Sequence, residues 1–181
     1  MNEPVKEISV SENVVIKIYY DEDPLNPRED FDNLGVIYSN HQRYNPDGHS
    51  IEELGDSWDE IMSNLKENYV WAKVYAYIHS GIALSLSSFN DPWDSGLFGI
   101  IAAKKEDVRK EYGKKRISKQ VRDKVTGVFK GEVEELCAYY NGEVYGYVIE
   151  KDGEEMESCW GYFDLDYAED SAKEAAEGYA A

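Results

Sequence analysis

The sequence has few of the side chains that bind metals or form disulfides. It contains two cysteines and three histidines in 181 residues. Cys137 and Cys159 do not form a CxxC pair, so the simplest zinc and redox motifs are missing and free, reduced thiols are the simplest account. His41 and His49 bracket a loop that contains Asp47, and such a set can hold a cation, although loop residues of these types are more often only hydrated. We therefore expect no metal.

Long apolar segments are also missing from the sequence. No run reaches the roughly 18–20 consecutive apolar residues that a membrane-spanning helix needs. Residues 1–11 alternate polar, charged and apolar side chains, which excludes the apolar core of a signal peptide. These absences lead us to expect a soluble, cytoplasmic protein that makes no membrane contact.

The common catalytic motifs are absent as well. The chain contains no GxSxG, HExxH or P-loop pattern, and Gly35 and Gly48 are isolated turn glycines rather than a phosphate cradle. The most site-like cluster is Trp93–Gly96, because a turn lined by tryptophan can hold a ligand; a structural turn with Trp93 in the core is the simpler interpretation. We expect no enzymatic activity and no cofactor. A small-molecule or nucleotide enzyme with a pocket near Trp93 and Asp94 stays an alternative.

Basic residues are scarce relative to acidic ones. Thirty-seven acids face 19 bases, and the formal net charge is −18, well beyond the magnitude of roughly 2–8 that keeps a small domain soluble. The chain is nevertheless 42% hydrophobic and 13% aromatic, so it folds around a core instead of remaining disordered. The excess charge belongs either to a solvated surface, as in a salt-adapted host, or to a surface that competes with a phosphate backbone for a basic site.

The pattern of apolar residues predicts an α+β fold: a single domain over residues 1–181, with a mainly antiparallel sheet and two or three amphipathic helices packed on it. Ser50 and Glu53 form a predicted capping box at the start of one helix. Val128 is placed on the core face of the longest helix, where Gly127 and Gly131 favour a kink or break. Strands are expected at 14–20, 35–39, 71–78, 82–89, 97–103, 144–149 and 156–163, and helices at 51–66, 106–112, from Ser118 to Asn141, and at 167–179 as a surface helix.

Charge is distributed unevenly along the chain. Residues 104–130 hold 11 bases and 4 acids and lie between two acidic regions. Either the two signs pair within the fold, or the acidic face meets a basic groove while the basic face touches RNA or acidic residues. The final hairpin and tail concentrate negative charge most densely and are the predicted partner-binding surface. Its candidate residues are Glu150, Asp152, Glu154, Glu155, Glu157, Asp164, Asp166, Glu169 and Asp170.

Several short blocks follow one another along the chain: Asn26-Pro27-Arg28-Glu29, Asp32-Asn33-Leu34-Gly35, Arg43-Tyr44-Asn45, Pro92-Trp93-Asp94-Ser95-Gly96, Glu111-Tyr112-Gly113, Arg116-Ile117-Ser118, Glu143-Val144-Tyr145-Gly146-Tyr147 and Ser158-Cys159-Trp160-Gly161. Across roughly residues 12–165 this set resembles a family of small proteins from phages, plasmids and other mobile elements. One branch of that family looks like type II-A anti-CRISPR proteins, which inhibit Cas9. The resemblance implies binding to guide-loaded Cas9 and loss of target-DNA engagement, and it carries over no catalytic residue.

The physics of Cas9 is compatible with that implication. Cas9 holds its nucleic acids in positively charged channels and must first grip a short duplex motif, so an acidic protein can occupy the same channels. Steric wedging between lobes of the effector would give the same inhibition without mimicry. We therefore expect a basic nucleic-acid-binding protein of the bacterial defence machinery as partner, Cas9 with its guide RNA first, and no direct DNA binding. An anti-restriction DNA mimic is the alternative within the same class.

Overall fold

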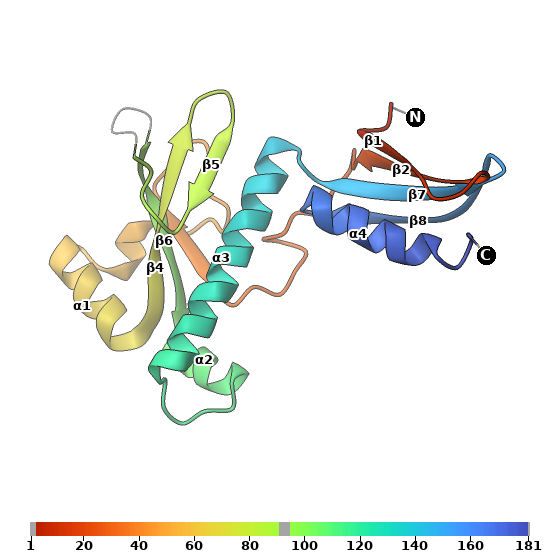
Figure 1. Ribbon diagram of the computed structural model, residues 1–181. Coiled ribbons are helices and arrows are strands. Elements are labelled where there is room, and N and C mark those ends of the chain that lie inside the picture. The colour runs from red at the N-terminus through yellow and green to blue at the C-terminus, as the bar shows by residue number, and fades with distance from the viewer. Residues whose placement is uncertain (1–2, 91–94, 181) are drawn as a thin grey trace. The chain divides into compact units, whose positions relative to one another are not determined.

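The computed structural model describes residues 3–90 and 95–180, except the side chain of Ser95. Within these residues the chain forms helices and two four-stranded antiparallel sheets (Figure 1). The predicted α+β class with antiparallel pairing is therefore confirmed. The chain is organised as two compact units: unit 1 comprises residues 1–26 and 138–181, and unit 2 comprises residues 27–137. The expectation of one domain over 1–181 stays a prediction.

The sheet of unit 1 joins the two ends of the chain. Its strands lie in the order β1-β2-β7-β8, with each neighbouring pair antiparallel. The bounds are β1 (Lys6–Ser9), β2 (Val14–Tyr20), β7 (Tyr145–Lys151) and β8 (Glu154–Tyr162). The strands β2 and β7 are internal and rich in β-branched and aromatic residues, whereas the polar strands β1 and β8 form the edges, where charge discourages pairing with other chains.

One face of this sheet is covered by α4 (Leu165–Ala176). Alternation along β2 directs Val14, Ile16 and Ile18 to that face, where all three are fully buried. On the helix, Ala168, Ala172 and Ala176 are fully buried at helical spacing, and their small side chains allow the helix to approach the sheet closely. The tail is thus a helix as predicted, but one face of it is part of the core.

The sheet of unit 2 has the strand order β3-β6-β4-β5. The bounds are β3 (Val36–Ser39), β4 (Tyr69–Ile78), β5 (Ile82–Ser85) and β6 (Ser95–Lys104). The strand β6 is internal, as its continuous apolar run predicted, and Ile100, Ile101 and Ala102 are buried. Gly99 is required there, because a Cβ at this position would lie 2.3 Å from the carbonyl oxygen of Tyr38 on β3.

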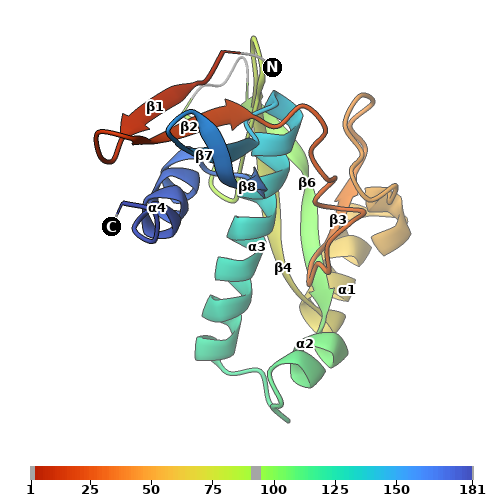
Figure 2. The same cartoon turned by 90° about the vertical axis from the view of Figure 1, so that its right-hand side faces the viewer.

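Helices lie on both faces of that sheet (Figures 1 and 2). The short 3-10 helix η1 (Ile51–Leu54) and α1 (Trp58–Asn68) bury Leu54, Ile61 and Leu65 against one face. The long helix α3 (Lys119–Asn141), which belongs to this unit up to Cys137, runs along the other. A short helix, α2 (Lys105–Glu111), precedes it and buries Val108.

Several local predictions differ from the structure; the strand expected at 82–89, for example, ends at Ser85. The helix predicted at 51–66 is interrupted at Gly55, where a Cβ would lie 2.9 Å from the backbone nitrogen of Ile61. The break predicted near Gly127 is wrong, since α3 is one continuous helix. Val128, which was predicted to lie on the core face of α3, is 39% exposed, whereas Val133, which was not predicted there, is buried. The edge strand β1 was not predicted because its residues are mostly polar.

Among the described residues, no helix combines the length and apolar character needed to cross a membrane.

Candidate partner-binding surface

The negative charge is concentrated in unit 1. This unit carries 18 acidic and 4 basic residues, a net charge of −14, whereas unit 2 carries 19 acidic and 15 basic residues, a net charge of −4. Unit 1 is also the smaller of the two. All nine candidate residues of the predicted partner-binding surface belong to it, so they lie in the part of the chain with the highest density of negative charge.

Five of these residues lie on the β7–β8 hairpin. Asp152, Glu154 and Glu155 are exposed at the turn and on the first residues of the edge strand. Gly153 follows Asp152, and both have positive φ angles, of 83° and 55°, as a tight hairpin turn requires. Among the described residues, no basic side chain lies within 4.0 Å of the carboxylates of Glu154 and Glu155. The turn thus holds these two charges in solvent on a fixed backbone.

The other two hairpin carboxylates are engaged within unit 1. Lys17 Nζ donates to both oxygens of Glu150 at 2.7 and 2.8 Å, and this hydrogen bond raises the pKa of Lys17. Glu155 stands opposite Glu150 across the strand pair, so Lys17 also offsets a repulsion between like charges. Glu157 accepts hydrogen bonds from the hydroxyls of Tyr147 and Tyr179, at 3.4 and 3.0 Å. Glu150 and Glu157 therefore have structural roles.

The remaining four candidates lie at the start of α4. Asp164 is its N-cap, and its carboxylate accepts from the backbone N–H of Tyr167 at 2.7 Å. Asp166 and Asp170 are exposed, and negative charge in the first turns is favourable because it opposes the positive end of the helix dipole. Glu169 is largely covered, with Lys173 at 2.6 Å and Lys6 of β1 also bound to it.

The structure therefore brings the candidates together as two groups rather than one. The hairpin group lies at the start of β8, and the α4 group follows its end. From Glu155, the last exposed carboxylate of the first group, to Tyr162 at its end, β8 spans about 23 Å at roughly 3.3 Å per residue. Each group offers three exposed carboxylates, Asp152, Glu154 and Glu155 in the first and Asp164, Asp166 and Asp170 in the second.

An exposed aromatic ring lies on the same edge strand. Trp160 is 47% exposed, and its indole lies flat over Gly146, where a Cβ would come within 2.1 Å of Cε3. Its ring centroid is 6.3 Å from that of Tyr19. Because Gly146 has no side chain, the indole of Trp160 on β8 can pack against the backbone of Gly146 on β7. This contact joins the sequence block Tyr145–Tyr147 to the block around Trp160.

A buried ionic cluster in unit 2 was not predicted. Arg28, whose side chain is only 2% exposed, donates from Nε and Nη2 to the two oxygens of Asp47 at 2.8 and 2.7 Å. Its Nη1 reaches Asn33 at 2.8 Å and Glu132 of α3 at 3.2 Å. Leu34 N–H also donates to Glu132, at 2.7 Å. The blocks around Arg28 and Leu34 therefore join the loop before β3 to α3.

Burial and pairing act against each other in this cluster. Desolvation lowers the pKa of Arg28. The hydrogen bond and charge of Asp47, with a contribution from Glu132, together raise this pKa by a larger amount, so the net pKa shift is upward. Burial raises the pKa of Glu132, and the N–H of Leu34 and the charge of Arg28 oppose that rise. Among the described residues no buried side-chain polar atom lacks a partner. The cluster is satisfied internally, which indicates a structural role.

The possible cation loop is used in another way. Asp47 is committed to Arg28 and to the N–H of Ile37, at 2.6 Å. His41 stacks on Phe98 and accepts backbone N–H bonds through Nδ1, while His49 pairs with Glu53 at 2.8 Å. In residues 3–90 and 95–180 no group of three metal-binding side chains is suitably placed. Trp93 and Asp94, which carried the enzyme alternative, lie outside the described residues.

Comparisons of this chain with protein-family models, curated proteins and solved structures found no match.

Proposed function

We propose that this chain is a binding protein that sets the acidic surface of unit 1 against a cationic, nucleic-acid-binding surface of a partner protein. The observation that carries this proposal is the net charge of −14 on unit 1 together with its six exposed candidate carboxylates. Like charges destabilise a compact unit, so a surface of this kind costs stability. Its cost is offset when a cationic partner replaces the repulsion with attraction.

The resemblance to mobile-element proteins makes guide-loaded Cas9 the first partner to test. In this proposal the chain acts in the cytoplasm of a bacterial host as an inhibitor and blocks target-DNA binding or cleavage. Cas9 holds nucleic acid in positively charged channels, and DNA gains affinity there by releasing counterions, a gain that an acidic protein surface shares. Steering between opposite charges also accelerates association. The two acidic groups, which lie at the two ends of β8, would reach separate points of such a channel.

Direct inhibition is the experiment that tests this function. Guide-loaded Cas9 is incubated with the wild-type chain, captured, and assayed for cleavage of target DNA. We expect co-capture and loss of cleavage. Cleavage that is undiminished at an excess of the chain would remove Cas9 as the target. Inhibition of a restriction enzyme instead of Cas9 would select the anti-restriction DNA mimic.

Two charge-reversal variants then locate the contact. Glu154→Lys with Glu155→Lys changes the hairpin group, and Asp166→Lys with Asp170→Lys changes the α4 group by the same net charge. Glu157 is left intact because it holds Tyr147 and Tyr179. If the hairpin group makes the contact, the first variant should raise the Kd at least about tenfold, as expected for a close charged contact, and the second should have a smaller effect. Unchanged affinity in both would contradict an acidic contact surface.

A further inference from the structure

A second charged surface, of opposite sign, lies in unit 2. It is formed by the end of β6, α2, the turn at 112–118 and the first turns of α3, which lie together at one end of this unit (Figures 1 and 2). We call it the basic surface. Its exposed cations are Lys104, Arg109, Lys110, Lys114, Lys115, Arg116, Lys119, Arg122 and Lys124. Val108, Val121 and Val125 are buried beneath them, so the backbone that carries these cations is anchored to the core.

None of these nine cations forms an ion pair with a described residue of unit 2. The salt bridges of unit 2 join Arg28 to Asp47 and Glu132, His49 to Glu53, and Lys130 to Glu134. Pairing of opposite signs, one of the two interpretations of the sequence, therefore does not occur at this surface among the described residues of unit 2. Nine cations thus have no ion-pair partner in the described part of unit 2, although acids outnumber bases in the chain, whose net charge is −18.

Fold stability does not explain this arrangement. The first turn of α3 contains no acidic residue and begins with Lys119, so its charge opposes the helix dipole, which favours acidic side chains at that end. The cluster Lys114-Lys115-Arg116 adds mutual repulsion immediately before the helix. Positions that lower stability in this way are typical of binding surfaces, where a ligand supplies the missing opposite charge.

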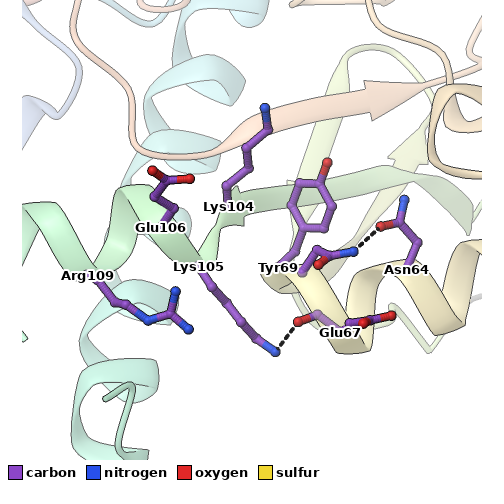
Figure 3. A pocket seen from close by; sticks show the side chains of 8 residues that line it. Asn64, Glu67, Tyr69, Lys104, Lys105, Glu106 and Arg109 are labelled. Carbon is purple, nitrogen blue, oxygen red and sulfur yellow. Dashed lines mark hydrogen bonds between the residues drawn. The ribbon is translucent and has the colours of Figure 1, made fainter. Parts of the chain in front are cut away.

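A pocket adjoins the basic surface (Figure 3). It has a volume of about 400 Å³ and is lined by three cations, two carboxylates, two amides and one phenol: Lys104, Lys105, Arg109, Glu67, Glu106, Asn64, Asn68 and Tyr69. Lys105 is used structurally, because its Nζ donates to the carbonyl oxygens of Lys66 and Glu67 at the end of α1, at 2.8 and 2.6 Å. The amide of Asn64 already donates to the carbonyl oxygen of Leu54, and that of Asn68 donates to Asn64. Because Glu67 and Glu106 would also repel phosphate, the case for a phosphate contact rests on the exposed cations and not on this pocket.

The composition of the basic surface indicates backbone contacts rather than base recognition. Between residues 104 and 124 the one aromatic ring is that of Tyr112, which is half-buried. Proteins that bind unpaired bases usually stack them on exposed aromatic rings. Lysine and arginine without such rings contact phosphates, without regard to sequence.

We propose that the basic surface contacts the phosphate backbone of RNA carried by the partner. The inference rests on the proposed function in that the partner is a nucleic-acid-loaded protein. A ribonucleoprotein presents a cationic protein surface and a polyanion side by side, so it satisfies the acidic surface of unit 1 and the basic surface of unit 2 at once. Free RNA satisfies only the second, so it should bind more weakly than the ribonucleoprotein but still measurably at low salt.

The test compares guide-loaded with RNA-free Cas9. Affinities are measured for the wild-type chain and for a basic-surface variant, Lys114→Gln with Lys115→Gln and Arg116→Gln. The matched control carries Arg43→Gln, Lys66→Gln and Lys130→Gln, which remove the same charge from the same unit outside the basic surface. We expect wild type and control to bind guide-loaded Cas9 at least about tenfold more tightly than RNA-free Cas9, and the variant to lose most of this preference.

The other possible outcomes separate a failure of the RNA contact from a failure of the Cas9 proposal. A variant that keeps the full preference for guide-loaded Cas9 overturns the RNA contact alone. A variant that weakens equally toward RNA-free Cas9 also overturns it, since the basic surface would then contact protein carboxylates. If the wild type binds neither form, the Cas9 proposal fails. The RNA contact is then tested separately, by measuring whether the chain binds a fluorescent 20-nucleotide RNA in about 50 mM salt. Binding that the variant loses supports the RNA contact, and no binding overturns it.

Discussion

At the scale of single residues, Arg28 decides how the loop before β3 is held. The segment 21–33 is rich in acids and contains two prolines, so its composition predicts an exposed loop. One side chain in it is instead almost fully buried, because Asp47 and Glu132 supply the acceptors that a guanidinium needs. Both acceptors come from distant parts of the chain, and sequence spacing gives no sign of them.

Removing Arg28 should therefore destabilise unit 2 strongly. In Arg28→Met, Asp47 and Glu132 stay buried without their cation, which costs about 3–5 kcal/mol. Urea unfolding measures the loss, and Arg122→Ala, an exposed cation on α3, serves as control with a change below about 0.5 kcal/mol. A loss below about 1 kcal/mol for Arg28→Met would show that the buried cluster does not hold the loop.

Two glycines allow a matched test of close packing. Gly146→Ala places a Cβ 2.1 Å from Trp160, so the indole must leave the sheet, and we expect a loss of about 1–3 kcal/mol. Gly127→Ala, in α3, meets nothing within 4 Å and should gain about 0.5–1 kcal/mol through helix propensity. Thermal unfolding of both variants gives the signs, and stabilisation by Gly146→Ala would contradict the described position of Trp160.

At the scale of elements, the helices and strands that the sequence predicted are those with signals in neighbouring residues. Strands 14–20 and 144–149, the turn at 151–153 and the start of α3 at Ser118 follow from alternation, turn residues and caps, all of which act within a few residues. The division of 51–66 into two helices depends on the approach of Gly55 to the turn around Ile61, and the burial of α4 depends on the sheet beneath it. The approach of Gly55 leaves no periodic signal. Ala168, Ala172 and Ala176 do recur at helical spacing, but alanine is common on exposed helix faces as well, so the spacing alone did not indicate burial.

The contact between α4 and β1 gives a pH-dependent prediction. Hydrogen bonds from Lys173 and then Lys6 lower the pKa of Glu169 below its ordinary value of 4.5. A lowered folded-state pKa means that the stabilisation is present above the unfolded-state pKa and is lost as the pH falls through the folded-state value. Glu169→Gln should therefore be less stable than wild type at pH 7, and the gap should narrow by pH 3. Urea unfolding at both values checks this; a constant gap would contradict it.

At the scale of the whole molecule, the sequence predicted the sign of each segment but not the grouping of charges. The acidic termini come together as unit 1 because β2 pairs with β7, a long-range contact. Six of the nine candidate acids of the final hairpin and tail are exposed, since turns and the starts of helices are usually solvated. Their separation into two groups, and the commitment of Glu150, Glu157 and Glu169 to partners, required the structure.

The difference in charge between the units predicts different responses to salt. Screening weakens repulsion among exposed charges, so raising NaCl from about 50 mM to about 500 mM should stabilise unit 1, with a net charge of −14, more than unit 2, with −4. Hydrogen exchange followed by mass spectrometry separates the two, because protection is measured peptide by peptide. Equal changes in protection in β2 and β6 would contradict this account.

The most direct test of the acidic contact is the salt dependence of binding to guide-loaded Cas9. For wild type, we predict that the logarithm of the association constant falls linearly with the logarithm of salt concentration between about 50 and 300 mM. The slope should be clearly shallower in Glu154→Lys with Glu155→Lys, in which the basic surface is unchanged. An affinity that does not vary with salt, or an equal slope for the two proteins, would contradict the claim that the acidic surface of unit 1 binds a cationic partner.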